Sequence, residues 1–225
     1  TPAGGRVLLV APQVENNGVI RAPSGEIVLA AGSTVRLVDA NFPSIQVEVS
    51  ADGKALSLGN LANAAAGKVF AFVVKQSGTV SATSAVADGG RVVLKSAGEV
   101  QLAPGSRTEA AGTSGGSIVV QALQAVSFAG QIDTRGLVGA GGNVRIETPA
   151  ALAFSGTIDT SGATTGGTVA IEARELLAFT GTIDAKGLLA GGTAAVKVEE
   201  HLAFSGAIDV SSAGKGGAAT VEARE

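Results

Sequence analysis

The chain has 225 residues, and its 16 basic and 19 acidic side chains leave a formal net charge of −3 at pH 7. This balance excludes the basic face of a nucleic-acid-binding protein and gives an anionic membrane surface little to attract. Cysteine is absent, which excludes a disulfide framework and a thiolate metal site and agrees with export across an outer membrane in an unfolded state. The sequence contains no run of about 18 apolar residues, so it predicts no membrane-spanning helix.

The first part of the chain predicts short coils and one departure from them. Residues 4–24 and the stretch from 25 onward each predict a coil of about 20 residues, and Asn16-Asn17-Gly18 predicts a tight turn. Two alternating runs, 45–49 and 54–58, then flank Asp52-Gly53, a sequence typical of hairpin turns. We therefore expect a projecting β-hairpin at 43–58, its return at 59–66, and coils again from about Gly67.

A repeat organises the rest of the chain. Its weaker copy opens at Gly89-Gly90, and regular units then begin at glycine pairs spaced by 26, 25, 25 and 25 residues. These pairs start at Gly115, Gly141, Gly166, Gly191 and Gly216. We expect one domain over 1–225, with less regular coils and the hairpin in 1–66, irregular coils in 67–114 and regular coils in 115–225. The chain begins and ends inside this pattern, which indicates a fragment of a larger protein.

Each regular unit alternates apolar and polar residues in three short runs, without a helical period. In the unit 141–165, Val144 and Ile146 form one run, Leu152 and Phe154 the next, and Ile158 the third. Such alternation predicts strands with one buried face, and three strands in 20–26 residues predict one coil of a parallel β-helix. Because parallel crossovers are strongly biased towards the right, we predict a right-handed helix. The length of the chain predicts nine or ten coils, and strand spacing then gives a rod roughly 45 Å long.

Stacked coils place equivalent residues above one another in ladders. The apolar ladders, which we expect in the interior, are Phe128, Phe154, Phe179 and Phe204, and Ile132, Ile158, Ile183 and Ile208. A carboxylate ladder follows them, formed by Asp133, Asp159, Asp184 and Asp209. Burying one of the phenylalanines is expected to contribute about 2–3 kcal/mol.

The first half resembles a known family. The run GGRVLLVAPQVENNGVIRAPSGEIVLAAGSTVRLVD at 4–39 and VEVSADGKALSLGNL at 47–61 resemble the filamentous haemagglutinin family of two-partner secretion exoproteins, in the region after the secretion-signal core. The later GG…G-x-I-D-x-x-G units resemble the repetitive shaft of the same proteins. The resemblance implies export through an outer-membrane transporter and display on, or release from, a Gram-negative cell. Family roles include adhesion, biofilm cohesion and toxin delivery. The family's Asn-Pro-Asn-Gly secretion motif is absent, so no residue here is assigned to the secretion signal.

The aspartate ladder also allows two chemical interpretations, a polysaccharide-cleaving site and a metal site. The aspartate ladder is the only candidate for a polysaccharide-cleaving site, but it recurs from coil to coil, and the neighbouring Thr160-Ser161-Gly162 favours a turn in which aspartate accepts backbone N–H groups. Stacked carboxylates could hold a divalent cation, so Asp133, Asp159, Asp184 and Asp209 stay weak metal candidates.

The remaining candidates favour structural roles. The phenylalanines could stack on a sugar or base, yet they share the apolar phase of their strands, and the tryptophan and tyrosine common at sugar sites are absent. His201 stands at a position that varies between coils, which favours a solvated side chain. The glycine pairs lack the Lys-Ser/Thr and the helix of a phosphate-binding loop.

We expect no catalytic residue, cofactor or membrane insertion. The predicted function is a structural or adhesive shaft segment of a secreted surface protein, whose partners are the transporter and a host-cell or matrix surface reached through regions outside this chain. The alternative is a filament subunit that polymerises end to end, because solenoid ends are open sheet edges and GGAATVEARE at the C-terminus lacks a polar cap. A polysaccharide-active enzyme is a distant third.

Overall fold

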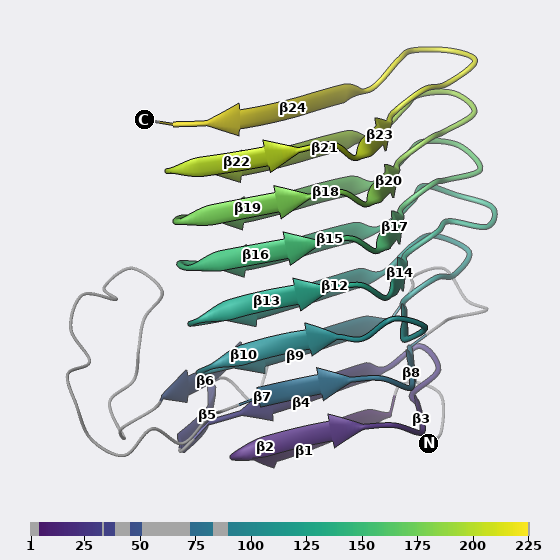
Figure 1. The fold of residues 1–225 in the computed structure, drawn as a ribbon. Coiled ribbons are helices and arrows are strands. Elements are labelled where there is room, and N and C mark those ends of the chain that lie inside the picture. Colours follow the sequence, from purple (N-terminus) through teal and green to yellow (C-terminus); the bar gives the residue numbers. More distant parts are fainter. Residues whose placement is uncertain (1–4, 33, 39–45, 51–72, 83–89, 225) are drawn as a thin grey trace.

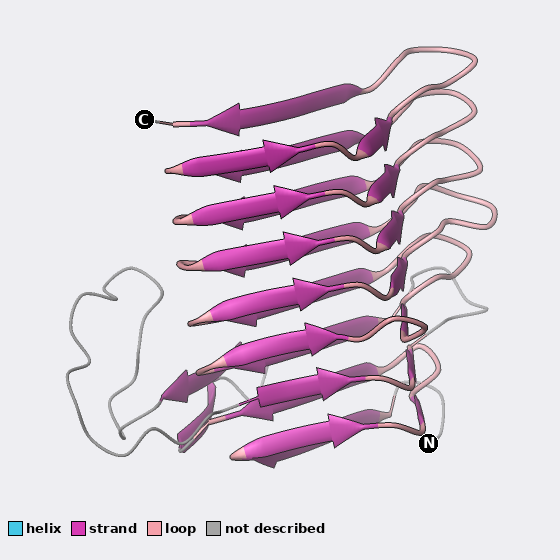
Figure 2. Ribbon diagram, viewed as in Figure 1, coloured by secondary structure: helices cyan, strands magenta, loops and turns pink. Residues whose placement is uncertain are grey.

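Three parallel sheets wind around one interior, and a small antiparallel pair lies beside them (Figure 1). The structure is a computed structural model that describes residues 5–32, 34–38, 46–50, 73–82 and 90–224. Within these ranges every regular element is a strand (Figure 2), and no helix could span a membrane.

Each complete coil contributes one strand to each of the three sheets, which we call sheets A, B and C, and β24 (Ala218–Ala223) adds a further strand to sheet A. In spatial order, the strands of sheet A are β1 (Arg6–Ala11), β4 (Glu26–Ala31), β9 (Arg91–Ser96), β12 (Ser117–Ala122), β15 (Asn143–Thr148), β18 (Thr168–Ala173), β21 (Thr193–Val198) and β24 (Ala218–Ala223). Those of sheet B are β2 (Gln13–Asn16), β7 (Val73–Gln76), β10 (Glu99–Leu102), β13 (Ala125–Phe128), β16 (Ala151–Phe154), β19 (Leu176–Phe179) and β22 (His201–Phe204). Those of sheet C are β3 (Val19–Arg21), β8 (Thr79–Ser81), β11 (Arg107–Glu109), β14 (Gln131–Asp133), β17 (Thr157–Asp159), β20 (Thr182–Asp184) and β23 (Ala207–Asp209).

The helix is parallel and right-handed, as the sequence predicts. In Figure 1 the chain runs to the right along the near strands of sheet B, returns to the left along the far strands of sheet A, and rises with each coil. This sense of rotation, combined with the rise, defines a right-handed helix. The repeat also follows the sequence, since Arg6 pairs with Glu26 in the first coils, and Asn143 pairs with Thr168 in the regular ones.

The number of coils is smaller than the nine or ten expected. In the described part of the chain, sheet A has eight strands and sheets B and C have seven each. The difference arises in the second coil, where Glu26 pairs with Arg91, 65 residues further along the chain. That coil therefore contains a long excursion, and the excursion takes up sequence that the repeat pattern assigns to additional coils.

The excursion includes an antiparallel pair that the sequence did not predict. β6 (Gln46–Ser50) pairs with β5 (Thr34–Val38), whereas the sequence placed 34–38 inside a coil. The run 54–58, which we expected to pair with 45–49, and the return at 59–66 lie outside the described residues, as does Gly67. Alternation identifies a strand with one buried face and carries no information on whether its neighbour is parallel or antiparallel. For this reason the sequence predicted both strands but placed 34–38 in a coil.

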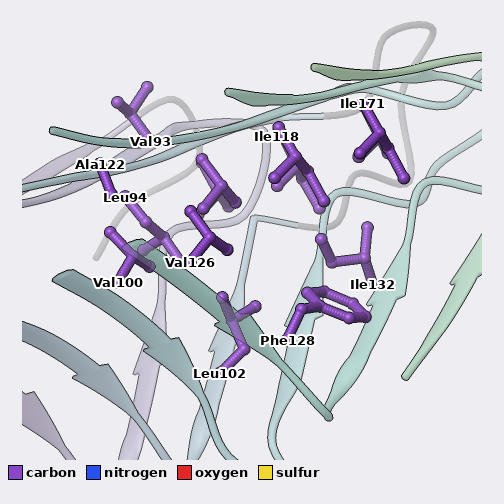
Figure 3. Packing of buried hydrophobic residues seen from close by; sticks show 14 of the residues in the cluster. Val93, Leu94, Val100, Leu102, Ile118, Ala122, Val126, Phe128, Ile132 and Ile171 are labelled. Carbon is purple, nitrogen blue, oxygen red and sulfur yellow. The ribbon is translucent and has the colours of Figure 1, made fainter. Parts of the chain in front are cut away.

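The interior is built from columns of equivalent side chains. Figure 3 shows Ile118, Phe128 and Ile132, one from each sheet, converging on the same core. All three are almost completely buried. The column that contains the phenylalanines becomes polar towards the N-terminus. It continues through Leu102 to the amide side chains of Gln76 and Asn16.

This buried amide pair explains the first turn. The Asn16 side-chain amide donates to Gln76 Oε1 at 2.9 Å, and Asn16 Oδ1 accepts the Gly18 N–H at 3.2 Å. The sequence predicted the turn at 16–18 but not the buried ladder. Each amide satisfies polar groups that burial would otherwise leave without a partner.

A buried carboxylate makes folding sensitive to pH. Glu26 lies between Arg6 (3.7 Å) and Arg91 (3.4 Å), and its side chain is only 7% exposed. Burial raises the pKa of Glu26 above its ordinary value of 4.5, against the opposing effect of Arg91 and Arg6. The folded chain therefore holds the Glu26 proton at higher pH than the unfolded chain, and stability falls as pH rises from about 4.5 through the folded pKa.

We expect Glu26→Gln to remove this pH dependence. Urea denaturation gives the free energy of unfolding of the parent and the variant at each pH. Any difference that is constant across the pH range is subtracted. The remaining difference should grow in favour of the variant as pH rises above about 4.5. Glu222→Gln on the more exposed outer face of β24 serves as the control, with a side chain 43% exposed in the parent. A constant difference across the pH range would contradict the assignment.

Candidate functional site

The carboxylate ladder ends successive strands of sheet C. Asp133, Asp159, Asp184 and Asp209 pair in register on β14, β17, β20 and β23. Glu109 of β11 occupies the same position one coil earlier. The structure therefore brings together all four aspartates that the sequence selected, and adds a fifth carboxylate.

Each aspartate closes the turn that follows its strand. In all four coils the carboxylate Oδ1 accepts the backbone N–H two residues later at 3.0 Å. The donors are Arg135, Ser161, Lys186 and Ser211. In the second of these turns Ser161 also donates its hydroxyl to Asp159 at 2.6 Å. This is the geometry of an Asx turn, in which the side chain replaces a backbone acceptor.

Cations in alternate coils separate the stacked carboxylates. Arg135 Nη2 lies 2.7 Å from Asp133, and its Nε lies 3.6 Å from Asp159. Lys186 Nζ lies 2.9 Å from Asp184 and 3.2 Å from Asp209. Each cation thus joins the carboxylate of its own coil to that of the next. A basic residue two positions after the aspartate in every second coil was the signal for this arrangement, and the sequence interpretation missed it.

The pKa shifts agree with this pairing. A hydrogen bond to Asp133 and its charge raise the pKa of Arg135, and hydrogen bonds to Asp184 and Asp209 raise the pKa of Lys186. Hydrogen bonds from Ser211 lower the pKa of Asp209, assisted by Lys186. These shifts favour the ionised form of each group, so the ladder is a set of ion pairs near neutral pH.

Neither general acid–base chemistry nor metal binding is favoured by this geometry. A general acid needs a raised carboxyl pKa, whereas the pKa of Asp209 in the ladder is lowered. Within the described ranges, no group of three or more acidic or imidazole side chains could hold a metal ion. The arrangement instead fixes the turns and ties adjacent coils together.

Asp184→Ala is expected to destabilise the chain by about 1 kcal/mol, because the variant loses the acceptor for the Lys186 N–H. Asp184→Asn keeps an oxygen in the same place and loses only exposed ion pairs, so its cost should be smaller and should shrink as salt is added. Urea denaturation at low and high salt measures both. Equal costs for the two variants would show that the turn hydrogen bond is unimportant.

The other sequence candidates have structural positions. The phenylalanine rings stack in parallel with centroids 4.6, 4.4 and 4.8 Å apart, and all but Phe204 are buried. Buried rings present no face to a sugar or a base. Ile132, Ile158 and Ile183 are buried beside them, and Ile208 packs against the same core. His201 opens β22 with an exposed side chain, in register with Leu176.

A shallow hollow lies where the strands of sheet A end and turn towards sheet B. It has a volume of about 200 Å³, and its lining includes Glu147, Glu172, Arg174 and Glu199. These groups are engaged in ion pairs, since Arg174 lies 2.7 Å from Glu199 and Arg145 contacts both Glu147 and Glu172. The hollow therefore lacks histidine and combines charges that are already paired, a composition typical of a solvated surface.

Comparisons with known proteins identify the fold. No protein-family model matches the chain, and no curated protein matches it. Among solved structures, it is similar to the crystal structure of the HMW1 secretion domain from Haemophilus influenzae, with a TM-score of 0.71 and 19% sequence identity. The match covers 98% of this chain and 61% of that chain. The chain is thus a parallel β-helix with the fold of a secretion domain, which agrees with the resemblance seen in its sequence.

Proposed function

We propose that the chain is a segment of a secreted bacterial exoprotein of the two-partner secretion type, in which the β-helix is a rigid shaft that supports adhesion or biofilm cohesion. The observation that carries this proposal is the fold match to a secretion domain over 98% of the chain. The sequence resemblance at 4–39 points independently to the same class. Export through an outer-membrane transporter and a final location outside the cell follow from that class, as does a host-cell or matrix partner.

The regularity of the coils supports a structural role. In the last coils, equivalent residues pair in register in all three sheets, and the carboxylates repeat the same turn. A catalytic site in a repeat protein is a local exception to the repeat. The described coils carry their polar groups as turn acceptors and ion pairs, which favours a shaft over a polysaccharide-active enzyme.

End-to-end polymerisation is the second candidate, because interior side chains are partly exposed at both ends of the described helix. Leu9 is 40% exposed, and Phe204 and Val221 are each 39% exposed. The shaft remains the first candidate, because the fold match and the regular coils support it.

The shaft proposal predicts that coils can be added without loss of stability. Duplicating residues 166–190 inserts one more coil between existing ones, with the same inward side chains and glycine pair. Since solenoid stability is approximately a sum over coils and their interfaces, the variant should unfold at the same or a higher temperature, and its rod should lengthen by about 4.8 Å. Calorimetry and small-angle X-ray scattering measure the two effects. A scrambled insert of the same composition is the control, and a duplicated coil that destabilises the chain as much as the scramble would count against the proposal.

A further inference from the structure

A row of five loop tips projects beside sheet C, where the coils from β11 onward return to sheet A (Figure 1). Parallel bridges align these loops, connecting Gly112, Gly136, Gly162, Gly187 and Ser212. The two residues after each bridge form the tip. We call the five tips together the loop ridge, and its members are 113–114, 137–138, 163–164, 188–189 and 213–214.

Large and small side chains alternate along the loop ridge. Leu137 and Val138 are 64% and 66% exposed, and Leu188 and Leu189 are each 62% exposed. The tips between and beside them hold only small residues, namely Thr113-Ser114, Ala163-Thr164 and Ala213-Gly214. The ridge therefore has two aliphatic projections and three recesses, with a period of two coils.

Backbone hydrogen bonds between successive loops fix the positions of these projections and recesses. Ala163 donates its N–H to Gly136 at 2.9 Å, Leu189 donates to Thr164 at 2.7 Å, and Lys215 donates to Leu189 at 2.9 Å. A side chain at Gly214 would begin 2.2 Å from the carbonyl oxygen of Leu189, so the recess there cannot be filled without moving the backbone. A preorganised surface loses little conformational entropy when it binds.

We propose that the loop ridge is a lateral self-association surface whose occupant is a second, antiparallel copy of this chain. A two-fold axis between the tips 163–164 and 188–189 places Leu188 and Leu189 of each copy over the small tip 163–164 of the other. The same operation places Leu137 and Val138 over the tip 213–214. Each projection then enters a recess, and the pairing is isologous and closed, as in most homodimers.

The spacing identifies the occupant. A different protein would need apolar projections and recesses at the separation of stacked β-coils, and a second copy of this chain has that separation by construction. Exposed aliphatic groups in regular array are uncommon on the surface of a monomer and mark interaction sites.

The charges around the loop ridge are compatible with the antiparallel pairing of two copies. None of the five tips carries a charged residue. At the base of the tips the residues alternate between Arg135, Ser161, Lys186 and Ser211. The antiparallel pairing sets Arg135 opposite Ser211 and Lys186 opposite Ser161, so cations do not face one another. Both cations already pair with aspartates of their own chain.

The contact is small, so the association is expected to be weak. A ridge of four aliphatic side chains per copy lies at the lower end of specific interfaces, where association is typically transient. Multiple copies held on one cell surface would raise the effective concentration well above that of the purified chain.

Sedimentation equilibrium of the purified chain over a concentration series tests the proposal. The parent should form a dimer, and Leu188→Ser/Leu189→Ser should weaken it at least tenfold. Ala163→Leu is the decisive variant, because it adds apolar surface but fills a recess. Interdigitation predicts weaker association for Ala163→Leu. Non-specific hydrophobic association predicts stronger association, and that result would overturn the proposal. Leu176→Ser removes an aliphatic side chain that is 42% exposed outside the ridge and should leave the dimer unchanged.

Cross-linking tests the orientation in the same protein. Because the chain has no cysteine, Ala163→Cys and Leu188→Cys variants can be mixed and oxidised without side reactions. We expect a disulfide-linked heterodimer from this mixture and none from Ala163→Cys mixed with Leu176→Cys. A parent chain that stays monomeric at all concentrations, or that binds neutral phosphatidylcholine vesicles through Leu188 and Leu189 as a monomer, would refute self-association at the ridge.

Discussion

Gly166→Ala is expected to destabilise the chain by about 3 kcal/mol or more, which is a large fraction of the stability of a domain. A methyl group at Gly166 would lie 1.8 Å from the carbonyl oxygen of Ala185 and 2.4 Å from the amide nitrogen of Gly192. Both atoms belong to the backbone, so relief requires the stacked turns to separate. Urea denaturation followed by circular dichroism measures the loss.

Gly216→Ala is the matched control. Gly216 opens the equivalent glycine pair two coils later, and an added Cβ there meets nothing within 4 Å. The variant should be neutral or slightly stabilising, by up to about 1 kcal/mol, because alanine restricts the unfolded chain. If Gly166→Ala were tolerated as well as Gly216→Ala, close stacking of the turns would not be the reason for the glycine pairs.

The second large effect is expected in the phenylalanine column. Phe179 is buried between Phe154 and Phe204, with ring centroids 4.4 and 4.8 Å away. Phe179→Ala should cost about 3–5 kcal/mol, because it removes a large apolar side chain and leaves a cavity that the rigid coils cannot fill. Thermal and urea unfolding should show the same loss.

Position along the column provides the control for this experiment. Phe204 is 39% exposed and stacks on one ring of the described column, so Phe204→Ala should cost clearly less than Phe179→Ala. Phe179→Leu should fall between them, because leucine retains part of the buried surface. Equal losses at Phe179 and Phe204 would mean that stacking inside the column contributes little.

The regular half of the fold could be predicted because each coil repeats the same pattern of apolar residues and glycine pairs. Alternation at Val144 and Ile146 identifies one buried face, and glycine pairs 25 residues apart set the length of the coil. Once the length is known, the register of Asp159 with Asp184 follows by counting. The Asx turn follows as well, because an aspartate two residues before a turn N–H has few other roles in such a loop.

Features that depend on neighbours in space could not be predicted in this way. The strand Thr34–Val38 has the same alternation as a coil strand, and only its antiparallel partner distinguishes it. Glu26 meets Arg91 across the excursion of the second coil, so no local spacing connects them. The bridge from Lys186 to Asp209 also joins different coils, although its regular spacing would have revealed it once the coils were aligned.

The most direct test of the central claim is the length of the purified chain, measured by electron microscopy over a concentration series. A rigid shaft segment predicts short rods at every concentration, with eight layers of sheet A giving roughly 35 Å along the axis. Lateral pairing would widen these rods at high concentration and lengthen them only slightly. Filaments many times longer than one rod would contradict the account, because they would show that the ends of the β-helix are its interaction sites and that polymerisation is its activity.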